Sequence, residues 1–76
     1  SDLKSAKRHK ALVMARQIAM YLTRQLTSYS YPDIGDQFGG KDHSTIIHAI
    51  RKIDKQLEDD MQLRSTINNI KNSLTN

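Results

Sequence analysis

The chain has 76 residues and contains no cysteine. A chain of this length forms one small domain without room for a separate catalytic domain, and the lack of cysteine excludes a disulfide framework and a thiolate metal site. No apolar run approaches the roughly 20 residues that span a bilayer, so we expect no transmembrane segment.

Positive charge is concentrated at the front of the chain. The formal net charge is +4, and residues 1–29 carry six Lys or Arg residues against one Asp, whereas residues 54–76 carry three basic and four acidic residues. A positive field in one region indicates a polyanionic partner there. A solvated basic face without a partner explains the same charge equally well, so charge alone leaves both interpretations open.

Helical periodicity is clearest from Lys10 onward. Apolar residues at steps of three and four predict one long helix with a broad buried stripe, which comprises Leu12, Ala15, Ala19, Leu22 and Leu26. Residues 1–9 have weak periodicity, so we expect a short linker helix or arm that leads into a basic loop before this helix. A cluster of hydroxyl residues over 27–30 favours the end of the long helix.

Residues 30–57 have the spacing of a helix-turn-helix. Ser30 can cap a short helix with Pro32 in its first turn, and Gly39 supplies the left-handed exit that commonly ends a helix. Asp42 can cap a second helix a few residues later. Phe38 is the single Phe, and we expect it near the centre of the core. The expected buried seam of the second helix is Ile46, Ile50, Ile53 and Leu57.

A last helix completes the predicted fold. The acidic residues 58–60 interrupt the chain and place negative charge where a following helix begins. The apolar positions of that helix are Leu63, Ile67, Ile70 and Leu74. Because no stretch shows strand-like alternation, the predicted class is all-α, a small helical bundle that contains a helix-turn-helix and a basic loop before the long first core helix.

The residues give little support for catalysis or metal binding. His43 and His48 are five residues apart, which places them roughly 140° apart around a helix and not on one face as a metal pair requires. Gly39 and Gly40 precede a lysine but lack the spacing and the preceding strand of a phosphate-binding loop. We therefore expect no catalytic residue, no metal site and no enzymatic activity.

The start of the second predicted helix suits DNA better. His43, Ser44 and Thr45 can donate or accept hydrogen bonds, and the major groove of DNA admits the first turn of such a helix. The same three residues could instead serve only as cap and first-turn residues. A helical module that binds a regulatory protein or an anionic membrane surface is the second hypothesis.

Several stretches together resemble one known family. The run from Phe38 to Ala49, FGGKDHSTIIHA, resembles the signature of the C-terminal DNA-binding domain of the bacterial replication initiator DnaA. The similarity extends to Ala15–Met20, Pro32–Gly35 and Arg51–Ile53, and it covers nearly the whole chain, so residues 1–76 are expected to be one domain. The resemblance implies an all-helical domain that binds nine-base-pair DnaA boxes in double-stranded DNA at the replication origin.

The resemblance also implies roles for individual residues. Arg8 matches a basic-loop arginine that reaches into the minor groove. The residues that match major-groove base readers are Asp42, His43, Ser44 and Thr45. Positions associated with phosphate contact or close base contact match Arg16, Arg24, Tyr31, Pro32, Lys41 and His48. Ser44 stands where Thr is usual and lacks its methyl, and Lys41 replaces a frequent Arg and loses bidentate geometry.

For the whole initiator, the resemblance implies cofactors and partners beyond this domain. ATP and magnesium would belong to an ATPase module that this chain lacks, so we expect no cofactor here. Double-stranded DNA is the expected partner, with further contacts to anionic phospholipid or regulatory proteins, and to other initiator molecules through other domains. The implied location is the bacterial cytoplasm, in association with the nucleoid.

Overall fold

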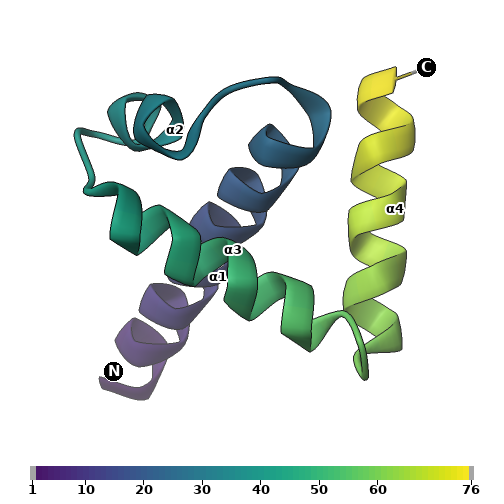
Figure 1. Ribbon diagram of the computed structural model, residues 1–76. Coiled ribbons are helices and arrows are strands. Elements are labelled where there is room, and N and C mark those ends of the chain that lie inside the picture. Colours follow the sequence, from purple (N-terminus) through teal and green to yellow (C-terminus); the bar gives the residue numbers. More distant parts are fainter. Residues whose placement is uncertain (1, 76) are drawn as a thin grey trace.

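The computed structural model describes residues 2–75, which form four α-helices and no strand (Figure 1). The helices are α1 (Asp2–Leu26), α2 (Tyr31–Gln37), α3 (His43–Gln56) and α4 (Met61–Thr75). Helix α3 crosses α1, α2 lies beside the start of α3, and α4 stands next to the C-terminal end of α1 (Figure 1). The predicted all-α bundle is thereby confirmed. Ser1 and Asn76, which the predicted domain includes, lie outside the described residues.

Helix α1 corrects one part of the prediction. We expected a short helix or arm and a basic loop over residues 1–9, but the described part of this stretch belongs to the same continuous helix as residues 10–26. The reason is composition, because no glycine or proline occurs between Asp2 and Leu26, and Lys, Arg, Ala and Leu are strong helix formers. Arg8 therefore lies on a helix and not in a loop.

Side-chain caps set the starts of α2 and α3, as predicted. The backbone N–H of Asp33 donates to Oγ of Ser30, and the backbone N–H of Ser30 donates to Oδ2 of Asp33, both at 3.2 Å, which completes a capping box. At α3, the backbone N–H of Ser44 donates to Oδ2 of Asp42 at 3.3 Å. Each cap satisfies an N–H group that has no partner within its own helix.

A close backbone contact sets the geometry of the turn between α2 and α3. Gly39 and Gly40 have φ angles of +88° and +75°, in the left-handed region that glycine adopts without strain. The turn brings the N–H of Lys41 to 2.9 Å from the carbonyl oxygen of Gly35. A Cβ atom on Gly35 would lie 2.2 Å from the carbonyl oxygen of Lys41, so this contact requires glycine. The two helices are therefore held in one fixed relation.

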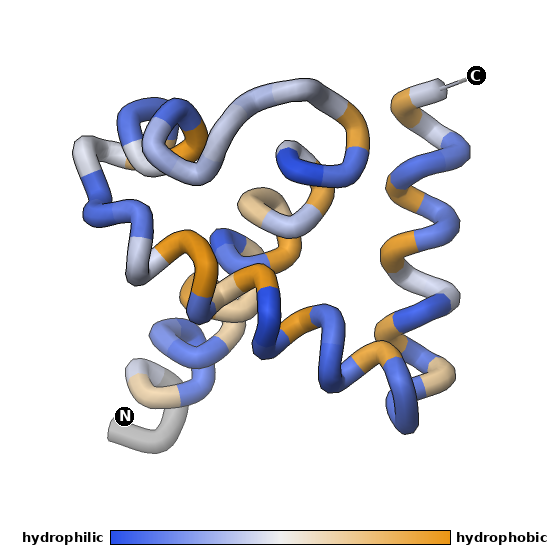
Figure 2. The backbone as a smooth tube through the Cα atoms, viewed as in Figure 1, coloured by the Kyte–Doolittle hydropathy of each residue, from blue (hydrophilic) through white to orange (hydrophobic). Residues whose placement is uncertain are grey.

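The core lies where the helices meet. Its buried side chains are Met20, Tyr21, Leu22, Ile34, Ile46, Ala49, Ile50, Ile53, Leu63 and Ile67. Figure 2 shows most apolar positions of α4 on the side that faces the other helices, whereas Met61 at its start is 76% exposed. The predicted seam of α3 is confirmed, because its three isoleucines are buried and Leu57 packs partly buried against them.

Five apolar residues are less buried than we predicted, and one of them is Ala15 of the expected α1 stripe, which is exposed. Leu12 is 51% exposed, since all residues from 5 to 12 lie on a part of α1 that no other helix covers. Leu26 and Leu74 are exposed because each lies in the last turn of its helix. Phe38 is only half-buried because it forms the C-terminal cap of α2 at the turn.

Candidate nucleic-acid interface

The start of α3 presents the predicted base readers together. Asp42, His43, Ser44 and Thr45 are all exposed, at the end of α3 that points away from α4 (Figure 1). Oδ1 of Asp42 lies 3.5 Å from Nδ1 of His43, and these side chains are 68% and 57% exposed. Ile46, in the same turn, is fully buried. The polar end of the helix is therefore open to a partner while its other face is anchored in the core.

The carboxyl of Asp42 is held in its ionised form. Interaction with the side chain of Ser44, followed by the hydrogen bond from the Ser44 backbone, lowers the pKa of this carboxyl, and the neighbouring His43 acts in the same direction. An ionised carboxylate can only accept hydrogen bonds. At a DNA surface it can accept one from a base amine, whereas phosphate groups repel it.

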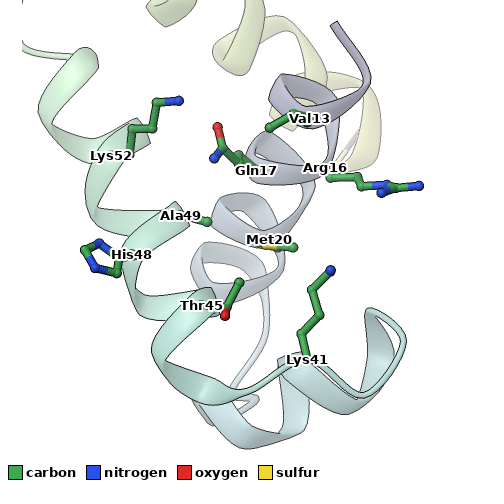
Figure 3. A pocket seen from close by; sticks show the side chains of 9 residues that line it. All are labelled: Val13, Arg16, Gln17, Met20, Lys41, Thr45, His48, Ala49 and Lys52. Carbon is green, nitrogen blue, oxygen red and sulfur yellow. The ribbon is translucent and has the colours of Figure 1, made fainter. Parts of the chain in front are cut away.

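A groove of about 460 Å³ lies between α1 and α3, beside these residues (Figure 3). Its lining includes the buried residues Met20 and Ala49, and its cations come from α1, the turn and α3, as Arg16, Lys41 and Lys52 respectively. Among the described residues that line the groove, none is acidic. An apolar floor with positive charge around it suits an anionic chain such as a nucleic-acid backbone.

Thr45 and His48 connect this groove to the start of α3. Both residues line the groove, and His48 also lines a smaller neighbouring hollow with Ser44 and Arg51. The predicted base readers are therefore continuous with a cationic surface. The predicted backbone-contacting residues on that surface are Arg16, Lys41 and His48.

Arg24, Tyr31 and Pro32 form a second group of predicted backbone contacts. The guanidinium carbon of Arg24 lies 4.3 Å from the ring centroid of Tyr31, and Nη1 of Arg24 donates to the carbonyl oxygen of Tyr29 at 2.8 Å. These contacts join the end of α1 to the start of α2, where Pro32 is exposed in the first turn. The negative end of the α1 dipole also favours a cation at this place.

Arg8 lies apart from both groups. It is exposed on α1, eight residues before Arg16, which corresponds to about 12 Å along the helix axis. Arg8 does not line the groove between α1 and α3. The structure thus gathers the other predicted contact residues around the helix-turn-helix and leaves Arg8 on the uncovered first half of α1.

A family model described as the bacterial dnaA protein helix-turn-helix matches residues 1–53, more than half of the chain. The chain belongs to this family. It is 60% identical to the chromosomal replication initiator protein DnaA of Geobacter metallireducens over 76 residues, 100% of this chain and 17% of that relative. It is 58% identical to the protein of that name from Levilactobacillus brevis over 73 residues, 96% of this chain and 16% of that relative. The resemblance identified from the sequence is confirmed.

Membership of a helix-turn-helix family indicates DNA binding as the activity of this domain. Such domains bind DNA, and the prediction that this DnaA-type domain is not an enzyme agrees with its family. Within residues 2–75, no helix combines the length and hydrophobicity that crossing a membrane requires. No group of three potential metal ligands occurs in the part of the chain that the structure describes.

Gln17 and Lys52 also line the groove, although neither was among the predicted contact residues. Oε1 of Gln17 is buried without a hydrogen-bond partner among the described residues, so it can accept a hydrogen bond from a ligand. Helical spacing offered a signal for Lys52, because steps of three and four place it on one face with Thr45 and His48. The opposing face of α1 depends on how the two helices cross, which spacing within one helix does not determine.

Proposed function

We propose that this domain binds double-stranded DNA in a sequence-specific manner and recognises DnaA boxes at a replication origin, with α3 in the major groove. The exposed start of α3 carries the proposal, because four polar residues lie there at the end of a firmly held helix-turn-helix. Side chains at the N-terminal end of a recognition helix are those that contact base edges.

The four residues at the start of α3 can read different features of a base pair. Ionised Asp42 can accept a hydrogen bond from an amine such as cytosine N4. The hydroxyls of Ser44 and Thr45 donate or accept, and Thr45 adds a methyl group that can contact the methyl of thymine. The imidazole of His43 has one donor and one acceptor when neutral. This mixture supports discrimination among bases and not merely attachment to a polyanion.

The cationic groove and the residues at the start of α2 are suited to the DNA backbone. Arg16, Lys41 and Lys52 supply charge on both sides of the groove, and Arg24 supplies it beside α2. Contacts to phosphate set the register and orientation of a protein on the duplex but carry no direct sequence information. We therefore assign these residues to positioning, with Tyr31, Pro32 and His48 close to the same strand.

We further propose that Arg8 enters the adjacent minor groove. The minor groove of B-DNA is about 6 Å wide, whereas an α-helix with its side chains is about 10–12 Å across, so only the side chain of Arg8 can enter. A narrow minor groove has an enhanced negative potential that attracts arginine. A recognition helix in one groove and an arginine in the next would resemble the docking of homeodomains.

A role in replication initiation rests on the relatives. They are named chromosomal replication initiator proteins, and this chain spans 17% of the length of the first one described above. We propose that this domain supplies DNA binding to such an initiator in the bacterial cytoplasm, in association with the nucleoid. In such an initiator, the parts outside this domain would bind ATP and magnesium and would contact other initiator molecules.

Fluorescence anisotropy tests the proposal with two labelled duplexes of equal length, one with a DnaA box and one with the same bases scrambled. We expect a preference for the box on the order of a thousandfold at physiological salt, as is typical of specific over non-specific binding. Arg8→Ala should reduce affinity for the box, while Arg64→Ala on α4 removes the same charge outside the proposed surface and should have little effect. Equal affinities of the wild-type domain for both duplexes would contradict the proposal.

An apolar groove between α1 and α4 favours protein or membrane contact as a second candidate function. Its lining includes Leu22, Ile70, Leu26 and Leu74, and the last two are 40% and 66% exposed. Exposed apolar area can bind a regulatory protein, and where the same helix also carries basic residues, as α1 does, it can bind an anionic membrane surface. Cosedimentation with vesicles of anionic phospholipid, lost in Leu74→Ser, would support the membrane form, and no cosedimentation of the wild-type domain would contradict it.

A further inference from the structure

Arg24 is held from two sides at the junction of α1 and α2. Its guanidinium carbon lies 4.3 Å from the ring centroid of Tyr31, a cation–π distance, and Nη1 donates to the carbonyl oxygen of Tyr29 at 2.8 Å. The ring itself has little freedom, because Tyr31 is half-buried and packs against the hydrophobic core. The guanidinium group is therefore oriented in the domain without DNA.

The segment that carries these two contacts is also ordered by hydrogen bonds. The hydroxyl of Thr27 donates to the carbonyl oxygen of Thr23 at 2.6 Å and accepts the backbone N–H of Tyr29 at 3.2 Å. On the other side, the capping box of Ser30 fixes the start of α2. Tyr29 and Tyr31, the residues that contact Arg24, thus lie in a segment whose backbone is held by hydrogen bonds on both sides.

Arg24 keeps most of its binding capacity. A guanidinium group has five N–H donors, and only one of them is engaged by the carbonyl oxygen of Tyr29. No carboxylate of residues 5–75 lies within ion-pair distance of Arg24, and the residue is exposed. Its charge and its remaining donors are available to an anion outside the domain.

We propose that Tyr31 is a positioning residue that holds Arg24 ready for a backbone phosphate of the bound DNA. This inference rests on the proposed function, and it assigns to Tyr31 an action through Arg24 in place of a direct contact with the duplex. A planar guanidinium stacks on an aromatic ring, which the ammonium of lysine does less well, and it can then donate two parallel hydrogen bonds to phosphate.

Orientation before binding matters because an arginine loses side-chain freedom when it binds. Ordering one flexible side chain at an interface costs about 0.5–1.5 kcal/mol, which corresponds to roughly a twofold to tenfold change in affinity. Tyr31 should therefore raise the affinity for DNA by about this factor. Because a phosphate is present at every base pair, the effect should be equal on specific and non-specific duplexes.

A double-mutant cycle with Tyr31→Leu and Arg24→Ala tests the inference, with affinities measured for the box duplex and the scrambled duplex. Tyr31→Leu, which keeps an apolar side chain, should weaken both complexes about twofold to tenfold when Arg24 is present and by less than about twofold in the Arg24→Ala background. Tyr31→Phe restores the ring and should recover most of the lost affinity. Arg24→Lys leaves the core untouched and should lose about as much as Tyr31→Leu.

The outcomes separate this inference from the proposed function. An equal loss from Tyr31→Leu in both Arg24 backgrounds, or wild-type affinity of Arg24→Lys, would overturn the positioning role while the box preference of the wild-type domain stands. A wild-type domain without affinity for either duplex would overturn both proposals. Circular dichroism of each variant shows whether a loss of affinity results from unfolding. The matched substitution Arg64→Ala removes another exposed arginine that donates a hydrogen bond to a carbonyl oxygen, and it therefore measures the effect of losing one positive charge.

Discussion

The helix-turn-helix formed by α2 and α3 and the C-terminal helix α4 both have apolar residues at helical spacing, but they differ in how deeply those residues are buried in the core. In α3, Ile46 and Ile53 are fully buried, and the backbone of the preceding turn contacts α2 at Gly35. In α4, burial is confined to the first half, and Leu74 at its end is 66% exposed. The comparison shows that the elements carrying the proposed DNA-contact residues of the helix-turn-helix are anchored most firmly in the core, whereas α4 mainly covers that core.

The largest expected difference between the two regions concerns their apolar side chains. Ile53→Ala should lower the free energy of unfolding by about 2–5 kcal/mol, because the residue is fully buried and its removal leaves a cavity. Leu74→Ala should change it by less than about 0.5 kcal/mol, since that side chain is exposed. Urea unfolding followed by circular dichroism measures both, and similar losses would contradict the proposed contrast.

The backbone contact at Gly35 gives the next largest effect. Gly35→Ala should destabilise the domain by about 2–4 kcal/mol, because the new Cβ would clash with the carbonyl oxygen of Lys41 and the turn must move. Ser65→Ala, an exposed helical position of α4, is the control and should leave the melting temperature nearly unchanged. If Gly35→Ala also melted like the wild type, the close approach of α2 to the turn would not be a constraint on the fold.

The proposed base contacts should distinguish α3 from α4 in DNA binding. Thr45→Ala should reduce the preference for the box over the scrambled duplex by about 1–3 kcal/mol, since it removes the hydroxyl and methyl groups proposed to contact a base pair. Thr66→Ala makes the same chemical change on the exposed surface of α4 and should keep the preference. Anisotropy titrations of both variants with both duplexes measure the effect, and parallel losses on the two duplexes would assign Thr45 to backbone contact.

The smallest expected effect is the acid sensitivity of the α3 cap. Since the folded-state pKa of Asp42 lies below the unfolded value, its stabilising contribution is complete above the unfolded pKa and disappears as the pH falls through the folded pKa. Asp42→Asn keeps an acceptor oxygen for the cap but removes this dependence. The difference in stability between wild type and variant, from urea titrations at about pH 6 and at progressively lower pH, should shrink on acidification. A constant difference would show that the charge of Asp42 does not contribute to the cap.

Local signals made most of the helix-turn-helix predictable. The capping residues Ser30 and Asp42 marked the starts of α2 and α3, and the glycines at 39 and 40 marked the end of α2, because each acts on the backbone within a few residues of itself. The buried face of α3 followed from its period. The predicted roles of its polar residues in DNA contact came from family resemblance and remain to be tested.

Features that depend on contacts between distant residues were not predictable in the same way. Leu12 fits the period of a buried stripe, but its burial depends on whether another helix extends far enough to cover it, and none does. The groove between α1 and α3 depends on the crossing of two helices, so the position of Gln17 within it was not predictable, whereas Lys52 shares a helix face with Thr45 and His48. The close approach at Gly35 likewise becomes visible only when the turn is placed against α2.

Selection of binding sites from a pool of random duplexes tests most directly the claim that the start of α3 reads bases. The wild-type domain should enrich a single motif of about the length of a DnaA box, and Thr45→Ala should relax the selected base at one or two positions within it while the rest is retained. No enriched motif for the wild-type domain, or the same motif with unchanged preference at every position for Thr45→Ala and His43→Ala, would contradict this claim.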